Sequence, residues 1–435
     1  MQPASAIADF AEIWLVDFEF HQPDGEIPKV ICMVAREWYS GRLLRIQFGE
    51  DPVLCPFGED SLIVAYYASA EINCYLQLGW LVPKHLLDLY PEFKNIRCGR
   101  RPDEGWGLLG ACHHFGIITG TTTESKDNFR QLAQQENLTA EEGEQLLDYC
   151  QSDVDATSAL FGKMVGLIDL PRALIRGRYM AALASVERKG IPIDTKTLGR
   201  LRQYWGTIKA DLINAVDSDF GVYENGTFKT NLWFRYCNRN GMAWPTLPSG
   251  DPDLKDEAFK DMAKLYPWIY PIKELRATLG QLKLNALAVG SDGRNRHILS
   301  AFGSLTGRNT PSNTKLAFGP AAWIRNLIQP TEGMALAYID WEQQEHGIAA
   351  ALSGDLRMQA AYNEGDPYLA FAKQAGAVPQ DATKSTHPQI RELYKATVLA
   401  VQYGMGDRSL AIRIGQTREY AKALLTAHKR LYRRP

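Results

Sequence analysis

The sequence predicts an α/β fold for the first part of the chain, followed by a mostly helical region and a second mixed region. Short apolar strands alternate with helical stretches over residues 1–165, which is the pattern of a layered α/β domain. The apolar periodicity is helical over 171–281, apart from the loop-forming stretch PTLPSGDPD. The second mixed region begins near Ser291, contains the apolar stretch ALAYIDW, which predicts a strand, and passes into helices over 343–432.

Bulk properties exclude several classes of protein. The chain of 435 residues has the length of roughly two to four domains, and its net charge of −2 favours no particular partner. The seven cysteines are scattered without a CxxC pair, which is typical of reduced thiols. No apolar run is long enough to cross a membrane, and the first residues lack the layout of a signal peptide, so we expect a cytoplasmic protein without a membrane partner.

Strands are predicted at four places in the first 70 residues. The stretches EIWLVDFEF, KVICMVA, LLRIQF and SLIVAYY are rich in branched and aromatic residues. The last of them continues as LIVAYYASAEINCYL, which reads as a strand that passes into a helix. Further along, MAALASVERKGIPID reads as a helix that ends at Gly190, because glycine is the residue that most often terminates a helix.

The first strand carries two acids in its apolar middle. Asp17 and Glu19 are two residues apart, so on a strand both carboxylates point to the same face. Burying neighbouring like charges is costly unless a cation pairs with them. This pair therefore predicts a positively charged partner.

Other acids can join this pair. In LLDYCQSDVDAT, Tyr149 and Asp153 are four residues apart and share one helix face, and Glu71 falls where a second helical turn can direct it back at the sheet. Asp17, Glu19, Glu71 and Asp153 would then form a cluster of four carboxylates. Carboxylates are ligands of Mg²⁺ or Mn²⁺, and two such ions about 4 Å apart support in-line attack on phosphodiesters. The alternative that Glu71 is a surface acid without a functional role stays open when this residue is considered by itself.

The stretches VDFEF, YYASAE and YCQSDVDAT resemble the three motifs of proofreading exonucleases with four acidic metal ligands. The resemblance implies an RNase H-like 3′-5′ exonuclease domain over 1–168, two Mg²⁺ or Mn²⁺ ions, and hydrolysis from single-stranded 3′ ends of DNA. It also implies that Tyr149 orients or helps to deprotonate the attacking water. The chain departs from the family in the second motif, where Glu71 stands in place of the usual Asp and Tyr66-Tyr67 in place of His-Asn.

The second half resembles family A DNA polymerases, the relatives of bacterial DNA polymerase I. The stretch MAALASVERKGIPID is similar to the start of their polymerase region, and LSAFGSLTGRNTPSN to their Thr-Gly-Arg segment, which places a primer-binding arginine at Arg308. ALAYIDWEQQEHGIAAALSGD is similar to the palm motif. By this resemblance Asp340, at the end of the predicted strand, holds Mg²⁺ and Glu345 lies near the sugar 2′ position, where it rejects ribonucleotides.

RELYKATVLAVQYGMG resembles the fingers helix that binds the incoming deoxynucleoside triphosphate. Arg391 and Lys395 lie one turn apart and suit triphosphate oxygens. Leu399 and Tyr403 continue the same stripe, although the family usually has an aromatic residue at the position of Leu399.

The resemblance implies that an incomplete right-hand polymerase follows the exonuclease, with a thumb over 169–290, a partial palm over 291–355 and fingers over 356–435. The last palm motif of the family, His-Asp-Glu, supplies a second metal-binding aspartate and does not occur in these 435 residues. We therefore expect a polymerase of phage or mobile-element type that is cut short, with exonuclease activity and without synthesis. Its expected partners are primer-template DNA, single-stranded 3′ ends and deoxynucleoside triphosphates.

Two alternatives stay open. The first is an autonomous exonuclease whose polymerase-like half only grips DNA. The second is a DNA-binding, non-catalytic half of a split polymerase, which would need a separate C-terminal chain as its partner. Metal-dependent degradation of an oligonucleotide distinguishes the first alternative from the second.

Overall fold

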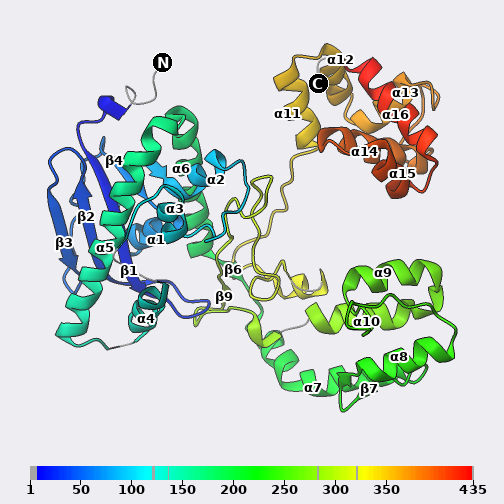
Figure 1. Cartoon of the computed structure of the whole chain (residues 1–435), viewed down its shortest axis with the longest axis horizontal. Helices are drawn as coiled ribbons and strands as arrows, with labels where there is room; N and C mark the ends of the chain where they lie inside the picture. The colour runs from blue at the N-terminus through cyan, green and yellow to red at the C-terminus, as the bar shows by residue number, and fades with distance from the viewer. Residues whose placement is uncertain (1–6, 120–122, 136, 282–283, 320–321, 434–435) are drawn as a thin grey trace. The chain divides into compact units, whose positions relative to one another are not determined.

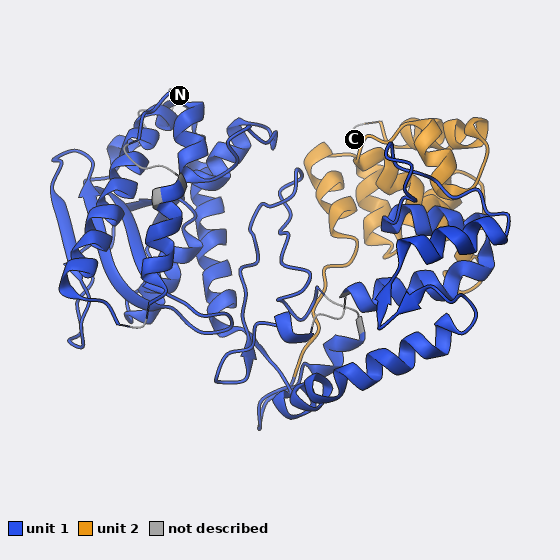
Figure 2. Cartoon of the chain, turned by 60° about the horizontal axis from the view of Figure 1, so that its bottom comes forward, with its two compact units in different colours: residues 1–335 blue, residues 336–435 orange. Residues whose placement is uncertain are grey.

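The computed structural model describes residues 7–119, 123–135, 137–281, 284–319 and 322–433 (Figure 1). The chain divides into two compact units, unit 1 with residues 1–335 and unit 2 with residues 336–435 (Figure 2). The four-part division expected from the sequence is finer than these two units, and its boundaries stay predictions.

Unit 1 begins with a five-stranded mixed sheet in the order β3-β2-β1-β4-β5. Strands β1, β2 and β3 pair antiparallel, whereas β4 pairs parallel to β1 and β5 parallel to β4. The first four strands confirm the strands predicted from the sequence, and β5 was not predicted because its apolar run is only a few residues long. The strands are β1 (Ile13–His21), β2 (Lys29–Glu37), β3 (Leu43–Gln47), β4 (Leu62–Ala65) and β5 (His85–Asp88).

Side chains alternate along β1 between two cores. Ile13 and Leu15 are fully buried on the face that α5 (Ala140–Met164) covers. Trp14 and Val16 belong to a second core on the opposite face, which α1 (Ser69–Gln77) and α6 (Leu170–Lys189) cover. The period of two therefore directs Asp17 and Glu19 to the α5 face of the sheet, as the sequence predicts.

The helices around the sheet begin and end at recognisable sequence signals. Helix α5 starts with a capping box between Thr139 and Glu142, and α6 starts at Asp169 and ends at Gly190, with a φ of 61°, as predicted. Three shorter helices and two 3₁₀ turns complete this part of unit 1. They are α2 (Leu89–Ile96), α3 (Leu108–His114), α4 (Thr123–Ala133), η2 (Ile7–Asp9) and η3 (Val165–Leu167).

Residues 195–281 are mostly helical, which confirms the periodicity read over 171–281. Trp233, Trp244 and Phe259 pack together in the core of this region, and the predicted loop over 245–253 contains no helix. The helices are α7 (Thr195–Asp217), α8 (Thr230–Arg239), α9 (Asp256–Leu265) and α10 (Tyr270–Gln281). Minor elements are β6 (Ile191–Pro192) paired with β9 (Arg294–Asn295), β7 (Tyr223–Glu224) paired with β8 (Thr227–Phe228), η4 (Pro267–Ile269), η5 (Leu284–Ala286) and η6 (Ala322–Leu327).

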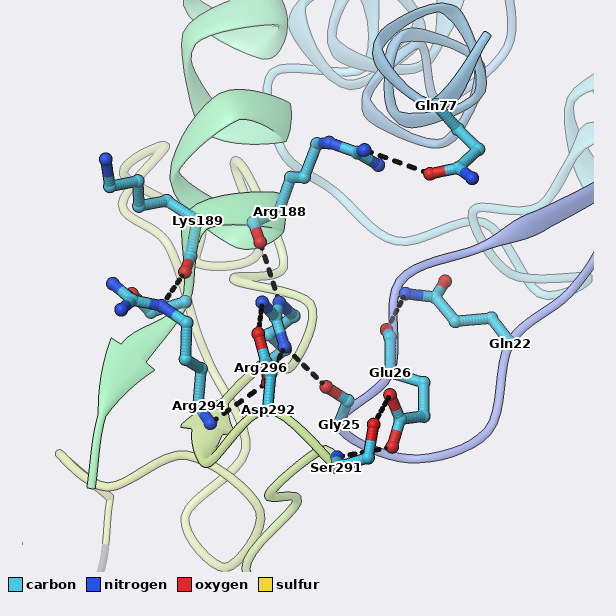
Figure 3. A network of polar contacts seen from close by, with 11 residues as sticks. Gln22, Gly25, Glu26, Gln77, Arg188, Lys189, Ser291, Asp292, Arg294 and Arg296 are labelled. Carbon is cyan, nitrogen blue, oxygen red and sulfur yellow. Dashed lines mark hydrogen bonds and ion pairs between the residues drawn. The ribbon is translucent and has the colours of Figure 1, made fainter. Parts of the chain in front are cut away.

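A polar network ties the segment around β9 back to the sheet (Figure 3). The buried guanidinium of Arg296 donates to Asp292 at 2.5 and 2.7 Å, to the carbonyl of Arg188 at 2.7 Å and to that of Gly25 at 3.1 Å. Gly25 has a φ of 87°, and a Cβ there would lie 2.5 Å from the backbone of Gly290. Only glycine fits this close approach of the β1–β2 loop to the later chain.

The regular elements among the described residues of unit 2 are all helices, in agreement with the helices predicted over 343–432. Phe371, Tyr394, Val398, Leu424 and Tyr432 form the centre of its core. The helices are α11 (Gln344–Ser353), α12 (Leu356–Asn363), α13 (Pro367–Gln374), α14 (Pro388–Gln402), α15 (Asp407–Ile414) and α16 (Arg418–Leu431).

The strand predicted at ALAYIDW is wrong. Residues 335–341 form an irregular segment, in which Tyr338 is 93% exposed, Ile339 86% and Trp341 77%. A strand needs a partner for its backbone hydrogen bonds, and no other segment among the described residues of unit 2 is extended into a strand. Apolar, β-prone side chains alone do not make a strand without that partner.

Candidate active site

Asp17 and Glu19 lie on β1 beside the central part of α5. Asp17 is opposite Val34 and Glu19 opposite Cys32 in the antiparallel pairing with β2, and the register shifts directly after Glu19. Such irregularities often occur beside active sites, where they redirect a side chain. The thiol of Cys150, on α5, lies 3.2 Å from the carbonyl oxygen of Asp17 and so joins the helix to the strand at this point.

Helix α5 brings Tyr149 and Asp153 to the same place. Both side chains are buried, and the hydroxyl of Tyr149 donates to Oδ2 of Asp153 at 3.1 Å, which confirms that they share one helix face. The ring of Phe129 stacks on the ring of Tyr149 with centroids 4.7 Å apart. Burial, and next the charge of Asp153, raise the pKa of Tyr149, so its hydroxyl stays protonated and acts as a donor.

Glu71 is buried at the start of α1, which follows β4 after a short turn. It lies in the first turn of the helix, not in the second as predicted, because α1 begins at Ser69. Asp88 fixes this turn by accepting the backbone N–H groups of Tyr67 at 2.9 Å and Ala68 at 2.8 Å. The sequence reading missed Asp88, although an acid between a short apolar run and a helix is a typical N-cap.

The charges of the four acids influence one another. Burial, and next the charge of Asp153, raise the pKa of Asp17 to about 7. Burial also raises the pKa values of Glu19 and Glu71, with the charge of Asp17 as the next cause for both. Asp17 thus lies within electrostatic reach of Glu19, Glu71 and Asp153, the other three acids that the sequence singled out in unit 1.

Three oxygens of this cluster are buried and find no hydrogen-bond donor among the residues that the structure describes. They are Oδ2 of Asp17, Oε2 of Glu71 and Oδ1 of Asp153. Buried polar atoms normally have a partner, and a carboxylate oxygen without a donor is a ready ligand for a cation. The donor set of hard oxygens therefore fits Mg²⁺ or Mn²⁺. No group of three His, Cys, Asp or Glu side chains among the described residues already stands in metal-site geometry, so an ion would require the carboxylates to turn toward it.

A lysine that the sequence reading missed also lies in the cluster. Nζ of Lys126, on α4, is 2.8 Å from Oδ2 of Asp153, and it lies 5.9 Å from the centre of the Tyr149 ring. Its charge opposes the effect of burial on the pKa values of Asp17 and Glu19. The sequence around Lys126 does not predict its contact with Asp153, because a lysine on a polar helix is usually solvated.

A pocket of about 480 Å³ opens beside the carboxylates. Asp17, Asp153 and Lys126 lie in its wall. Much of the remaining lining is aromatic and comes from Tyr66, Tyr67, Tyr90 and Trp106. The pocket thus combines acids, the two cations Lys126 and Arg130, and flat aromatic rings.

Arg308, the remaining candidate in unit 1, lies in a loop and is exposed. Its backbone N–H donates to the hydroxyl of Ser304 at 2.8 Å, which closes the loop on itself. The same loop contacts α2, since Nζ of Lys94 lies 3.4 Å from the carbonyl oxygen of Gly303. The segment with Arg308 is therefore held against the exonuclease-like part of unit 1.

Helix α14 in unit 2 carries Arg391 and Lys395, but their surroundings differ. Arg391 is buried, and its guanidinium donates to Asp366 at 2.5 Å and to Glu392 at 2.7 Å. The side chain of Lys395 is 41% exposed and lies 3.8 Å from Glu392. Leu399 follows one turn later and is half-buried.

The other candidates of unit 2 lie near the start of α11. Glu345 is in the first turn of this helix, and its Oε1 accepts the hydroxyl of Tyr403 at 2.6 Å, so the structure brings these two residues together. Asp340 lies in the exposed irregular segment and does not cap a strand as predicted. None of the helices in the described part of the chain is both long and apolar enough to cross a membrane.

Comparisons with known proteins support the second half of the sequence reading. Residues 272–434 match the family described as DNA polymerase family A. A DNA polymerase I from Chloroflexus aurantiacus is 26% identical over 260 residues, which cover 56% of this chain and 27% of that protein. The chain thus spans about a quarter of the length of this curated relative.

A solved structure extends the similarity in fold. The POL domain of Pol1 from M. smegmatis, in complex with DNA primer-template and dNTP, matches with a TM-score of 0.66 and 18% identity, over 99% of this chain and 75% of that chain. Residues 272–434 are therefore similar to family A DNA polymerases, and the chain has a mixed α/β fold that matches this solved polymerase domain.

Proposed function

We propose that unit 1 is a metal-dependent 3′-5′ exonuclease of RNase H-like fold that acts on DNA, joined to parts of a family A polymerase that hold primer-template. The observation that carries the proposal is the cluster of four carboxylates, in which three buried oxygens have no hydrogen-bond donor among the described residues. Buried neighbouring carboxylates are costly in their charged form, and a bound Mg²⁺ or Mn²⁺ would offset that cost.

The residues suit phosphodiester hydrolysis. Asp17, Glu19, Glu71 and Asp153 would hold Mg²⁺ or Mn²⁺, which when bound lowers the pKa of a water and balances charge on the phosphate. Because the Tyr149 hydroxyl stays protonated, it orients the attacking water rather than acting as its base. The aromatic rings of the pocket offer stacking surfaces for unpaired bases at a 3′ end.

The direct test is degradation of a 5′-labelled single-stranded oligonucleotide in Mg²⁺. The parent chain should shorten it from the 3′ end, EDTA should stop the reaction, and Asp17→Ala with Glu19→Ala should abolish it. Tyr149→Phe should slow hydrolysis without weakening Mn²⁺ binding. Asp155→Ala is a matched control, because this acid lies on the same helix but only pairs with Arg36 at the surface, at 2.6 Å. Parent-like degradation by the double variant would place the active site elsewhere.

For synthesis, we propose that unit 2 contributes part of a nucleotide site and that these 435 residues alone do not extend primers. The primer-template and dNTP named for the M. smegmatis structure support these ligands as partners. Lys395, Leu399 and Tyr403 would meet the nucleotide, and Asp340 would hold Mg²⁺. Nucleotidyl transfer uses two metal ions that are held by carboxylates. Asp340 is the one residue that the motifs identify as a candidate metal ligand for this reaction.

A primer-extension assay in an Asp17→Ala background tests this proposal, since degradation then cannot hide synthesis. No product is expected from the chain alone, whereas a C-terminal fragment that carries a His-Asp-Glu motif should restore extension. Asp355 and Asp366 are the nearest substitutes in sequence, but both already cap helices, and Asp366 also binds Arg391. Robust extension by the chain alone would overturn the proposal.

The exposed segment 335–341 favours a second candidate function, the binding of a partner chain. Its apolar side chains are exposed, and its backbone can form hydrogen bonds with a strand of another chain. In this case the protein is half of a split polymerase. Absence of any oligonucleotide degradation, together with recovery of extension by the added fragment, would favour this candidate over the exonuclease.

A further inference from the structure

Lys94, on α2, is a buried cation without an anion. Its residue is 7% exposed, and no carboxylate among the described residues lies within ion-pair distance of it. Nζ lies 3.4 Å from the hydroxyl of Tyr90 and 3.4 Å from the carbonyl oxygen of Gly303, which are both long for hydrogen bonds. It also lies over the rings of Tyr90 and Trp106, at 5.2 and 5.0 Å from their centres.

The acid on the same helix already has a partner. Glu92, on the same helix, is bound by both guanidinium nitrogens of Arg176 at 2.5 and 2.8 Å. Two aromatic faces stabilise an ammonium only weakly compared with the loss of its hydration. Burial accordingly lowers the pKa of Lys94. The ammonium group of Lys94 is therefore placed where an anionic ligand would stabilise it.

Lys94 lies between two pockets of unit 1. It lines a pocket of about 370 Å³ together with Asn95, Arg176 and the loop over 302–307. The rings beneath its ammonium, Tyr90 and Trp106, line the second pocket, which holds the carboxylates. The loop packs tightly here, since a Cβ on Gly99 would lie 2.7 Å from the side chain of Leu305.

We propose that Lys94 binds a backbone phosphate of a single-stranded DNA 3′ end, on a path that leads from the 302–308 loop over α2 to the carboxylates. Tyr90 and Trp106 would stack on bases along this path. The proposal rests on the proposed exonuclease function, and it assigns to Lys94 a role in guiding the strand rather than in hydrolysis. The 5′-phosphate of a released mononucleotide has the same chemistry as a phosphate of the DNA backbone. The test must therefore distinguish binding of the strand from binding of the mononucleotide.

The test measures binding in EDTA, so that its result does not depend on hydrolysis. A fluorescent single-stranded oligonucleotide is titrated with the parent chain, Lys94→Met, Lys94→Arg and the control Lys163→Met, whose lysine is exposed on α5. Lys94→Met should weaken binding roughly three- to tenfold and reduce the slope of log K against log salt by about 0.7, the share of one phosphate on a single strand. Lys94→Arg and Lys163→Met should bind like the parent.

A second series locates the phosphate. One phosphate at a time is replaced by a neutral methylphosphonate, counted from the 3′ end. A single position should weaken binding of the parent and have no further effect in Lys94→Met, a coupling that lost stability alone does not produce. If Lys94→Met does not fold, the methylphosphonate series is measured on the parent and on Lys94→Arg instead. The same phosphate position should then weaken binding of both proteins, because both keep a cation at residue 94.

Three outcomes overturn the proposal: parent-like affinity and salt slope in Lys94→Met, equal loss at every methylphosphonate position, or competition by a deoxynucleoside monophosphate that depends on Lys94 while strand binding does not. Failure of the exonuclease function itself is separate. It would appear as absence of degradation by the parent chain in Mg²⁺, with the binding results unaffected.

Discussion

The acids of unit 1 and the polymerase-like residues of unit 2 are positioned in different ways. In unit 1, β1, α1 and α5 each contribute acids to one enclosed cluster, and the cores on both faces of the sheet hold these elements in place. In unit 2, Asp340 lies in an exposed irregular segment, and only Glu345 and Tyr403 meet.

The comparison shows what a site requires beyond its motif. A motif residue reaches its position only when the element that carries it is itself held by long-range partners. The β1 strand has neighbours on both sides, whereas 335–341 has no strand partner among the described residues. We therefore expect substitutions in the two units to have different consequences.

The largest difference should appear in hydrolysis. Asp17→Asn or Asp153→Asn should each reduce the rate of single-turnover 3′-5′ hydrolysis on the order of a hundredfold, because each removes a metal ligand. Asp340→Asn, a change of the same chemistry in the exposed segment, should leave this rate unchanged. Equal losses from the two units would mean that both sites serve one reaction.

The two cations of α14 should differ in their effect on stability. Arg391→Ala leaves the partly buried carboxylate of Asp366 without its guanidinium partner and should destabilise unit 2 by about 2 kcal/mol. Lys395→Ala should change stability by less than about 0.5 kcal/mol, because its side chain is partly exposed. Hydrogen exchange of α13 and α14 measures both effects. Equal protection in the two variants would show that the Arg391 pair contributes no stability.

The two units should respond to pH with opposite signs. The folded pKa of Asp17 is about 7, above its ordinary 3.8, so its contribution to stability is present below 3.8 and is lost as the pH rises to 7. His428 is buried beside His346, and its folded pKa of about 4 is below its ordinary 6.5. Its contribution is present above 6.5 and is lost as the pH falls to 4.

The contribution of Asp17 is at most on the order of 4 kcal/mol and that of His428 at most on the order of 3 kcal/mol. In EDTA, hydrogen exchange of α5 and α16 reports the two trends separately. Asp17→Asn should reduce the loss of hydrogen-exchange protection in unit 1 near pH 7. His428→Phe should reduce the loss of protection in unit 2 near pH 5. If both units lose protection in the same direction over pH 4–7, these two groups do not control the trend.

A smaller effect is expected at Lys126. Lys126→Met leaves the Asp153 carboxylate without its cation and should lower the melting temperature in EDTA, while Lys126→Arg should not. Because Mn²⁺ then replaces the missing charge, it should raise the melting temperature of Lys126→Met more than that of the parent. Hydrolysis should fall roughly tenfold, the equivalent of one lost charge-assisted hydrogen bond. An identical response to Mn²⁺ in both proteins would remove Lys126 from the site.

The smallest expected change is at the polar pair of unit 2. Tyr403→Phe removes the hydrogen bond to Glu345 and should cost about 1 kcal/mol or less, since Tyr403 is half exposed. Faster hydrogen exchange confined to the first turn of α11 would reveal it. Tyr420→Phe, which changes another exposed tyrosine of unit 2, serves as the control.

Local periodicity made much of the exonuclease-like site predictable. The period of two on β1 places Asp17 and Glu19 on one face, and the spacing of four on α5 joins Tyr149 to Asp153. The same reasoning failed for Glu71 by one turn, because the start of α1 depends on Asp88 from the next strand.

The sequence by itself determined the first four strands of the sheet, the faces that the acids of β1 and α5 occupy, and the similarity of 272–434 to family A polymerases. These follow from neighbours a few residues apart. Only the tertiary structure decided that Lys126 pairs with Asp153, that Lys94 stays without an anion, and that 335–341 forms no strand. Such outcomes depend on which distant segments supply charge, rings or backbone partners, and short-range patterns carry no information about them.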